Sequence, residues 1–323
     1  MFGIEQGPDP DSDLLVRAAG HTFVVGVVSR ALPGLIAARA ECVTAATNRL
    51  DARATPLLAA PFMTDSARQA CEAAGAQWID LCGNARIVVS GLRVIVDGYP
   101  NRFRVVGRPS SVFAPKSARV VRWLLMHSQG AVTQRMIARA TDMDEGFVSR
   151  IASRLEHESY VVRDAKGSLR VRDPALLLDA WHAEYRFDRH TLIPGLVADR
   201  SGDALTRFVG DTLAAEDVEH AATGFSAAWR LTPFSSFRVA TYFIAAPLTE
   251  QVRTKLGFQE EARGANLWLV IPNDVGVLHG AKEQGGVRCV HPVQAYVDLK
   301  GHPERAKEAA DRLRETLVAS WGA

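Results

Sequence analysis

The sequence is poor in cysteine, and the four cysteines that it has are spread along the chain. Cys42, Cys71, Cys82 and Cys289 form no Cys-x-x-Cys pair, and no histidine pair at metal-binding spacing accompanies them. Neither a structural zinc site nor a disulfide framework is therefore expected, and the sequence predicts no metal and no cofactor. Isolated thiols are typical of a reducing compartment, which favours a cytoplasmic protein.

Long hydrophobic runs are also missing. No stretch approaches the roughly 18 uninterrupted apolar residues that a membrane-spanning helix needs. The acidic beginning of the chain, MFGIEQGPDPDSD, lacks the basic and apolar regions of a signal peptide. The sequence therefore predicts no membrane span, and it again favours a cytoplasmic location.

Charge of one sign does not dominate the chain, which has 38 Lys and Arg against 36 Asp and Glu and a net charge of +2. Hydrophobic residues make up 47% of the 323 residues, which is enough to build hydrophobic cores. At roughly 100–200 residues a domain, this length predicts two or three domains. Because the global charge does not indicate a partner, a nucleic-acid footprint has to be sought in single segments.

Strand and helix patterns alternate in residues 1–112. HTFVVGVVSR and ATPLLAAPFM are typical of buried strands, whereas ALPGLIAARAEC and TDSARQACEAAGA are typical of helices. Thr64 is the expected N-cap of the second helix, and Gly75 is expected to end it. QWIDLCGNARIVVSGLRVIVDGY is expected to form two strands, with breaks at Gly83-Asn84 and Gly91. This alternation predicts an α/β domain, followed by a connector rich in proline and arginine, PNRFRVVGRPSSVFAPKS.

Residues 113–174 are predicted to form a winged helix-turn-helix. KSARVVRWLLMHS, VTQRMIARA and DEGFVSRIASRLEHE each place apolar residues at helical spacing, and Thr133 is a plausible N-cap of the second helix. YVVRDAKGSLRVRD is typical of a hairpin whose tip spans residues 164–167. Three helices followed by a two-stranded wing is the order of elements in a unit that docks its second motif helix in the major groove of DNA.

Positive charge is concentrated in this middle segment. Residues 116–172 contain 11 Lys and Arg against 6 Asp and Glu, a balance of +5, so the rest of the chain carries −3. Double-stranded DNA is therefore the predicted partner. Arg150, Arg154 and Ser149 are expected to reach the groove, and Arg135, Arg139 and Lys166 are expected to contact phosphates. The full set of predicted DNA-binding residues is Gln134, Arg135, Arg139, Ser149, Arg150, Ser153, Arg154, Arg163, Lys166 and, in the connector, Arg104.

The alternative for this segment is a dimerisation or spacer module that binds no nucleic acid. Asp142, Asp144 and Glu145 support that interpretation, because carboxylates at the start of the recognition helix suit its dipole but repel phosphate. Whether the protein forms a homodimer is left open.

Residues 175–323 again alternate between strand and helix patterns. DPALLLDAWHAEYRF predicts a helix with Pro174 at its first position. SSFRVATYFIA, ANLWLVIPND and GVLHGA are expected to be strands, LTEQVRTKLGF a helix, and PERAKEAADRLRETLVASW the final helix. The apolar side of the final helix is expected to pack on the last sheet; it consists of Ala306, Ala309, Ala310, Leu313 and Leu317. This segment predicts a C-terminal α/β domain.

Three stretches together resemble the AbiEi-type antitoxins of type IV toxin–antitoxin systems, in their longer form of transcriptional regulators. The first is WIDLCGNARIVVSGLRVIVDG, in which Asp80, Gly83 and Asn84 match the D-x-x-G-N turn of the family, and the second is the winged helix. In the third, GANLWLVIPND leads to a Pro-x-Gln-x-Tyr-x-Asp-Leu block; its matching residues are Pro292, Gln294, Tyr296, Asp298 and Leu299. The winged helix is central here, whereas it opens the chain in the better-known members.

The resemblance implies a restriction-endonuclease-like fold for the first domain and a DNA-binding regulator of its own promoter. It also implies a nucleotidyltransferase toxin that the protein counters without direct contact. The expected architecture is thus a mixed α/β chain of three parts, with the winged helix-turn-helix between two α/β domains.

A nuclease of this fold would need two carboxylates and a lysine around Mg²⁺. The candidate carboxylates are Glu41, Asp80 and Asp97, but no Glu-x-Lys or Asp-x-Lys follows Asp80. A structural turn, in which Asp80 and Asn84 bond local backbone amides, is the preferred interpretation. The sequence therefore predicts no catalytic residue and a protein that is not an enzyme, with a Mg²⁺-dependent nuclease and an interaction scaffold as the alternatives.

Overall fold

The chain was analysed as a computed structural model that describes residues 3–29, 31–51, 53–103, 111–198, 202–232, 237–261, 263–302 and 305–322. Its contacts divide it into two compact units. The first contains Met1–Ser111, Ala152–Asp164 and Val171–Ala183, and the second contains Val112–Ile151, Ala165–Arg170 and Glu184–Ala323. Both are mixed α/β, as the sequence predicts, and the division into three domains stays a prediction.

The first unit is built on a seven-stranded sheet whose strands lie side by side in chain order. They are β1 (Gly3–Gln6), β2 (Leu14–Ala18), β3 (His21–Val27), β4 (Thr55–Ala60), β5 (Gln77–Asp80), β6 (Ala85–Val89) and β7 (Leu92–Val96). β3, β4 and β5 are parallel, and the outer pairs are antiparallel. The helices α1 (Pro33–Leu50) and α2 (Asp65–Ala73) are the crossovers that parallel strands require.

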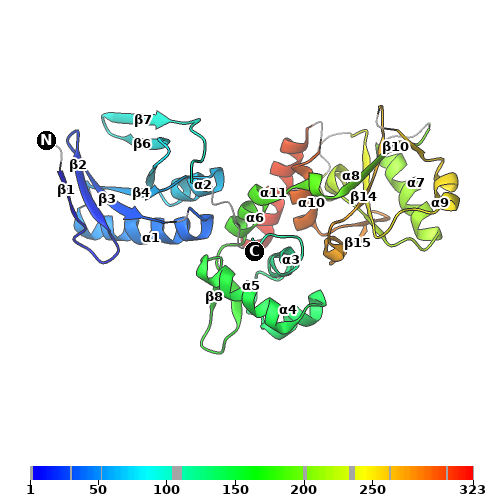
Figure 1. Cartoon of the computed structure of the whole chain (residues 1–323), viewed down its shortest axis with the longest axis horizontal. Helices are drawn as coiled ribbons and strands as arrows, with labels where there is room; N and C mark the ends of the chain where they lie inside the picture. Colours follow the sequence, from blue (N-terminus) through cyan, green and yellow to red (C-terminus); the bar gives the residue numbers. More distant parts are fainter. Residues whose placement is uncertain are drawn as a thin grey trace. The chain divides into compact units, whose positions relative to one another are not determined.

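The two helices pack against each other and cover one face of this sheet (Figure 1). Successive side chains of a strand point to opposite faces. Val24, Leu58 and Trp78 therefore join the helices in one core, while Phe23 and Leu57 belong to a second cluster on the other face. Because both faces of the sheet are buried at β3 and β4, these two strands are almost continuously apolar.

Several sequence predictions for this unit are confirmed, and others are wrong. Thr64 caps α2 by accepting a hydrogen bond from the amide of Ala67 at 3.3 Å, and Gly75 follows the helix with φ +70°. Residues 77–96 form three strands rather than two, because both predicted breaks, at Gly83-Asn84 and at Gly91, reverse the chain. The sequence patterns also missed β1 and β2.

The middle segment has the predicted order of elements. They are α3 (Ala118–Met126), α4 (Gln134–Thr141), α5 (Glu145–His157) and a two-stranded sheet of β8 (Val161–Arg163) and β9 (Leu169–Val171). The apolar residues expected to face a core are all buried: Val120, Val121, Leu124, Leu125, Ile137, Ala138, Val148, Ile151, Ala152 and Leu155. Gly167 turns the hairpin with φ +81°.

The second unit contains another seven-stranded sheet, of mixed direction. Its order is β13 (Gln259–Glu260), β10 (Thr191–Leu196), β14 (Leu267–Ile271), β12 (Ala240–Ile244), β11 (His220–Ala222), β16 (Val287–Cys289) and β15 (Lys282–Gln284). The helices α7 (Gly202–Ala215) and α9 (Glu250–Leu256) pack together. A second group consists of α8 (Gly224–Leu231), α10 (Pro292–Leu299) and α11 (Ala306–Gly322) (Figure 1).

Two predictions for this part of the chain are wrong. GVLHGA, expected to be a strand, contains the 3-10 helix η2 (Val275–Leu278), because the side chain of Asp274 accepts the amide of Gly276 at 2.8 Å and starts a helical turn. The apolar side of α11 is buried as expected, but the helix packs mainly on α8 and α10 and not on the sheet. Pro174 does open a helix, α6 (Pro174–Glu184).

No helix in the described part of the chain is both long and apolar enough to cross a membrane. All four cysteines are free thiols, and the cytoplasmic location stays a prediction.

A chain of buried polar groups connects α3 to α10 within the second unit. The Nε of Arg122, a residue that is 3% exposed, donates to Oε1 of Gln294 at 2.8 Å, and Nε2 of Gln294 donates to Asp298 at 2.7 Å. The hydroxyl groups of Tyr185 and Thr223 also donate to the Asp298 carboxylate. This carboxylate is fully buried, and its hydrogen bonds replace those that water would make.

Burial raises the pKa of Asp298 to about 7, although its three hydrogen bonds favour the charged form. The folded protein therefore binds this proton more tightly than the unfolded chain does, and the contribution of Asp298 to stability falls as pH rises from about 4 to 7. The replacement Asp298→Asn removes this titration. We expect the loss of stability in Asp298→Asn to be largest near pH 4 and to shrink towards pH 8.

Urea denaturation of the wild type and the variant, measured at several pH values, tests this prediction. A loss of stability that is the same at pH 4 and pH 8 would contradict it. The control is Asp311→Asn, which removes an exposed carboxylate from α11. Its free energy of unfolding should equal that of the wild type at every pH.

Candidate nucleic-acid interface

A tight turn joins α4 to α5. Thr133 caps α4 by accepting the amide of Met136 at 3.2 Å, and the helix ends at Asp142, which adopts the left-handed conformation with φ 50°. Asp144 then accepts the amide of Phe147 at 2.9 Å and so begins α5. Asparagine and aspartate tolerate this backbone region better than most residues, so the sequence TDMD suits a short turn between two helices.

One face of α5 is open to solvent, and we call it the α5 strip. Its residues recur every three or four positions, which places them on one side of a helix: Gly146, Ser149, Arg150, Ser153 and His157. Ser149 is half-buried, and the other four are exposed. The opposite face carries the buried apolar residues, so the strip is the part of α5 that another molecule can reach.

An aromatic ring gathers two cations at the beginning of the α5 strip. The ammonium nitrogen of Lys116 lies 5.5 Å from the centre of the Phe147 ring, and the guanidinium carbon of Arg150 lies 5.5 Å from the same centre. A cation at this distance from an aromatic face is attracted to it. Phe147 therefore holds two positive charges close together without neutralising either of them.

The basic residues of α4 differ in their surroundings. Arg135 is exposed and pairs with Glu145 at 3.3 Å, whereas exposed Arg139 has no ion-pair partner among the described residues. Gln134 is the first residue of α4 and is half-buried. Of the cations predicted on this helix, Arg139 is thus the one whose charge is not balanced locally.

Two other predicted residues are held by carboxylates. Arg154 pairs at 2.9 Å with Glu158, a residue that is only 3% exposed, and Arg163 pairs at 3.2 Å with Glu156. Removing the cation from a buried carboxylate is costly, so the ion pair gives Arg154 a structural role. Its predicted contact with DNA, and that of Arg163, stays untested.

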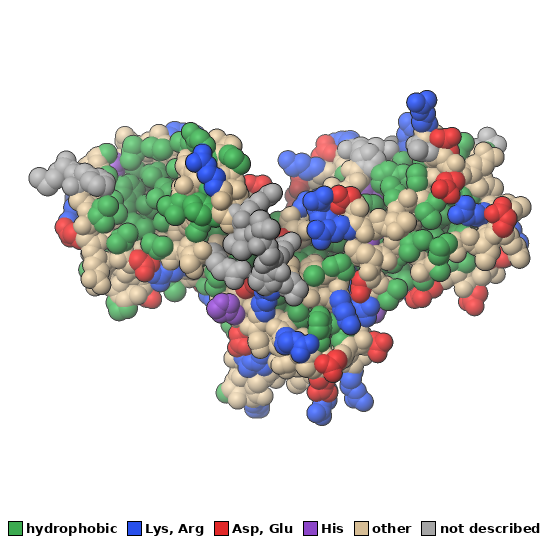
Figure 2. Space-filling view, in the orientation of Figure 1, with side chains coloured by type: hydrophobic (Ala, Val, Ile, Leu, Met, Phe, Trp, Pro, Cys, Tyr) green, Lys and Arg blue, Asp and Glu red, His purple; other side chains and the backbone are tan. Residues whose placement is uncertain are grey.

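The remaining predicted residues lie in different places. Ser153 belongs to the α5 strip, and exposed Lys166 lies in the turn between β8 and β9. Arg104 lies outside the described residues. Figure 2 shows acidic side chains interleaved with basic ones over the region of α3 to α5, which agrees with the ion pairs described above.

Sequence reasoning missed four residues of this surface: Lys116, Gly146, Phe147 and His157. His157 continues the three- and four-residue spacing of Arg150 and Ser153, so helical periodicity could have identified it. Lys116 and Phe147 are far apart in the sequence and meet only in the folded chain, so no local pattern marks that contact.

The candidate nuclease residues do not form a carboxylate cluster. Both oxygens of Asp80 accept hydrogen bonds from the protein, from the amides of Met63 (3.2 Å), Cys82 (2.9 Å) and Asn84 (2.9 Å) and from the side chain of Asn84 (2.9 Å). This geometry confirms the structural turn that the sequence predicts. Asp97 pairs with Arg68 at 2.8 Å.

Glu41 pairs with Arg172 at 2.6 Å, so it too is engaged in a local contact. Among the described residues, no group of three or more His, Cys, Asp or Glu side chains is arranged to hold a metal ion.

Comparisons with models of protein families, with curated proteins and with solved structures found no match for this chain. The resemblance to the AbiEi-type antitoxins therefore stays a prediction.

The carboxylate of Asp80 holds its turn together. Asp80→Ala leaves four donors in a buried turn without their acceptor, and we expect the free energy of unfolding to fall by about 3 kcal/mol. Asp97→Ala removes a carboxylate whose side chain is 66% exposed and should cost about 0.5 kcal/mol. Urea denaturation followed by circular dichroism measures both, and equal losses for the two variants would contradict the structural role of Asp80.

Arg119 joins α3 and the end of α4 to the start of η2. Its guanidinium donates to both carboxylate oxygens of Asp274, at 2.8 and 2.9 Å, and to the carbonyl oxygen of Thr141 at 3.2 Å. The two charged side chains are only 14% and 11% exposed. Because Arg119→Met leaves the Asp274 carboxylate without its cation, we expect a loss of about 3 kcal/mol in unfolding free energy.

The matched control for Arg119→Met is Arg305→Met, which breaks an exposed pair with Glu308. We expect it to change the free energy of unfolding by less than about 0.5 kcal/mol. Denaturation followed by tryptophan fluorescence measures both variants. If Arg119→Met were as stable as the control, the bidentate pair with Asp274 would contribute nothing.

Proposed function

We propose that this chain is a DNA-binding transcriptional regulator that places α5 in the major groove of double-stranded DNA. The observation that carries the proposal is the α5 strip: a polar helix face, free of apolar side chains, on the second helix of a helix-turn-helix segment. Lys116 and Arg150 add two positive charges at the beginning of this strip. A helix of this kind fits the width of the major groove.

Within this proposal, the residues of the strip have different roles in DNA recognition. Arg150 is the side chain suited to a two-pronged contact with O6 and N7 of guanine. Ser149 and Ser153 can donate to or accept from base edges and phosphates, and His157 extends the contact towards the C-terminal end of the helix. Gly146, which has no side chain, allows the backbone of α5 to approach a phosphate closely.

The cations around the strip supply affinity rather than specificity. Lys116 and Arg139 would contact phosphates beside α5, and Lys166 would reach the backbone from the turn of the wing. Arg154 and Arg163 are reassigned from direct contacts to the support of α5, because Glu158 and Glu156 hold them. Three or four phosphate contacts per chain would make log K fall against log[salt] with a slope of about −3.

The resemblance to the AbiEi-type antitoxins suggests which DNA to test. A regulator of that kind would bind upstream of its own coding sequence, so the natural operator is expected in that DNA. The nuclease alternative is weaker, since hydrogen bonds from the protein already occupy both oxygens of Asp80. A scaffold without DNA affinity remains the competing function.

Fluorescence anisotropy with the protein's own upstream duplex and a scrambled duplex, over a salt series, tests the proposal. We expect Arg150→Ala to weaken binding to the upstream duplex by about 10-fold to 100-fold and to reduce the preference over scrambled DNA. Lys116→Ala should weaken binding to both duplexes alike and lower the salt slope by about 1. Arg263→Ala, an exposed arginine of the second unit far along the chain, is the control.

A different binding result would contradict DNA recognition by α5. Weak binding of equal strength to both duplexes, unchanged by Arg150→Ala, would contradict a groove-reading role for α5. The helix-turn-helix segment would then be an interaction scaffold, and the oligomeric state of the protein would be the property to measure.

A further inference from the structure

A cavity of about 590 Å³ opens in the second unit between the C-terminal end of α7, the beginning of β11 and the hairpin of β15 and β16. Its volume lies in the range that holds a small organic molecule. The lining comes from three separate segments of the chain, residues 210–220 and both strands of the hairpin. None of these residues takes part in the proposed contact with DNA.

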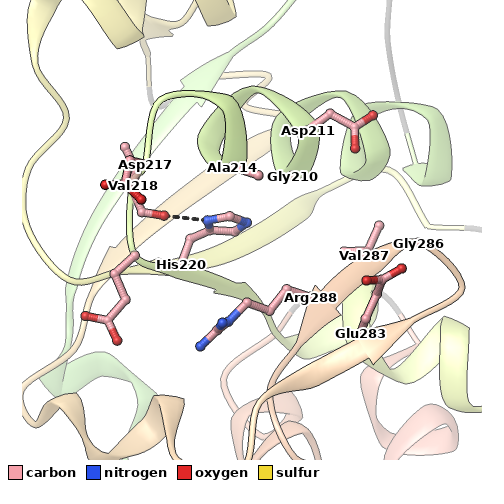
Figure 3. A pocket seen from close by; sticks show the side chains of 11 residues that line it. Gly210, Asp211, Ala214, Asp217, Val218, His220, Glu283, Gly286, Val287 and Arg288 are labelled. Atoms are coloured by element: carbon pink, nitrogen blue, oxygen red, sulfur yellow. Dashed lines mark hydrogen bonds between the residues drawn. The ribbon is translucent and has the colours of Figure 1, made fainter.

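Carboxylates are the most frequent charged groups of the lining. Asp211, Asp217, Glu219 and Glu283 line the cavity, and within the described part of the chain none of the four forms an ion pair. Figure 3 shows Asp211 and Glu283 on one side of the imidazole ring of His220 and Asp217 on the other. All four are exposed residues, so water screens part of their mutual repulsion, and a bound cation would relieve the rest.

His220 gives the cavity a buried polar group with an unused acceptor. The residue is 5% exposed, and its Nδ1 lies 2.7 Å from the carbonyl oxygen of Val218. A carbonyl can only accept, so Nδ1 carries the proton and Nε2 presents a lone pair. Burial lowers the pKa of His220, which keeps the ring neutral. Among the described residues nothing donates to Nε2, and the ring lines the cavity.

Arg288 is the one basic residue in the lining. It lies directly opposite Glu283 on the hairpin, but the two side chains do not form an ion pair within the described structure. With His220 neutral, the formal charge of the lining is −3. An anionic ligand is therefore disfavoured, and Arg288 is expected to weaken, rather than assist, the binding of a cation.

We propose that this cavity binds an organic polycation, an aliphatic diamine or triamine whose ammonium groups contact Asp217 and Glu283 and donate a hydrogen bond to Nε2 of His220. Each ammonium group brings several donors and no acceptor, which suits a lining of carboxylates and one imidazole lone pair. A compact metal ion fits less well, since no three of these side chains converge as metal ligands in the described structure.

Isothermal titration calorimetry of the full chain with spermidine tests this inference. We expect saturable binding of one spermidine per chain. Asp217→Asn and Glu283→Gln, which keep the shape of the side chains and remove the charge, should each weaken binding at least tenfold. Arg288→Gln should strengthen it several-fold, because it removes the only positive charge of the lining. Asp311→Asn removes an exposed charge outside the cavity and should leave the affinity unchanged.

Three outcomes would overturn the inference. The first is equal affinity in Asp217→Asn, Glu283→Gln and Asp311→Asn, which would mean general attraction to an acidic surface. The second is weaker binding in Arg288→Gln, which would indicate a ligand with an anionic group. The third is a heat of binding that disappears when NaCl of the same ionic strength as the spermidine solution is present. Because these measurements use no DNA, their failure is independent of the proposed regulatory function.

Discussion

The ion pair between Arg119 and Asp274 is the contact on which the arrangement of the second unit depends. One guanidinium bonds both oxygens of Asp274, which starts η2, and the carbonyl of Thr141, at the end of α4. Two neighbouring helices, α3 and α4, are thereby joined to η2, which lies far along the sequence. Arg122 adds a second connection, through Gln294 to the buried Asp298. The helices α3 and α4 are thus bonded to η2 and α10 by directional polar bonds, and these restrict orientation more than apolar contacts do.

Ion pairs within the chain reduce the number of cations in the middle segment that a partner could contact. A surplus of +5 suggests a broad basic surface, but Arg119, Arg154, Arg163 and Arg172 are paired with carboxylates inside the protein. The cations left for a partner are concentrated near Phe147 and on α4. The positive charge that the sequence counts therefore has two uses, and part of it supports the fold. A small set of well-placed cations is what the proposed contact with DNA requires.

Features that depend on neighbouring residues could be predicted from the sequence, whereas features that depend on distant segments could not. Caps such as Thr64 and Thr133 and the apolar stripe of α3 are local, and the sequence predicted them correctly. The turn at Asp80 was predictable as well, because aspartate and asparagine bond neighbouring amides. The strand expected at GVLHGA was wrong, since capping by Asp274 outweighed the β propensity of Val277. The pairing of Lys116 with Phe147, and the cavity beside His220, depend on segments that meet only after folding.

The buried network around Asp298 also has a consequence for proton exchange. Burial lowers the pKa of His190 to about 4, while it raises that of Asp298 to about 7, and the hydroxyl of Tyr185 touches both groups. At mildly acidic pH, unfolding therefore releases a proton from Asp298 and takes one up at His190. The two transfers cancel, so the pair behaves as a proton-neutral unit. Within this network, the buried carboxylate and the buried imidazole thus compensate each other in mildly acidic solution.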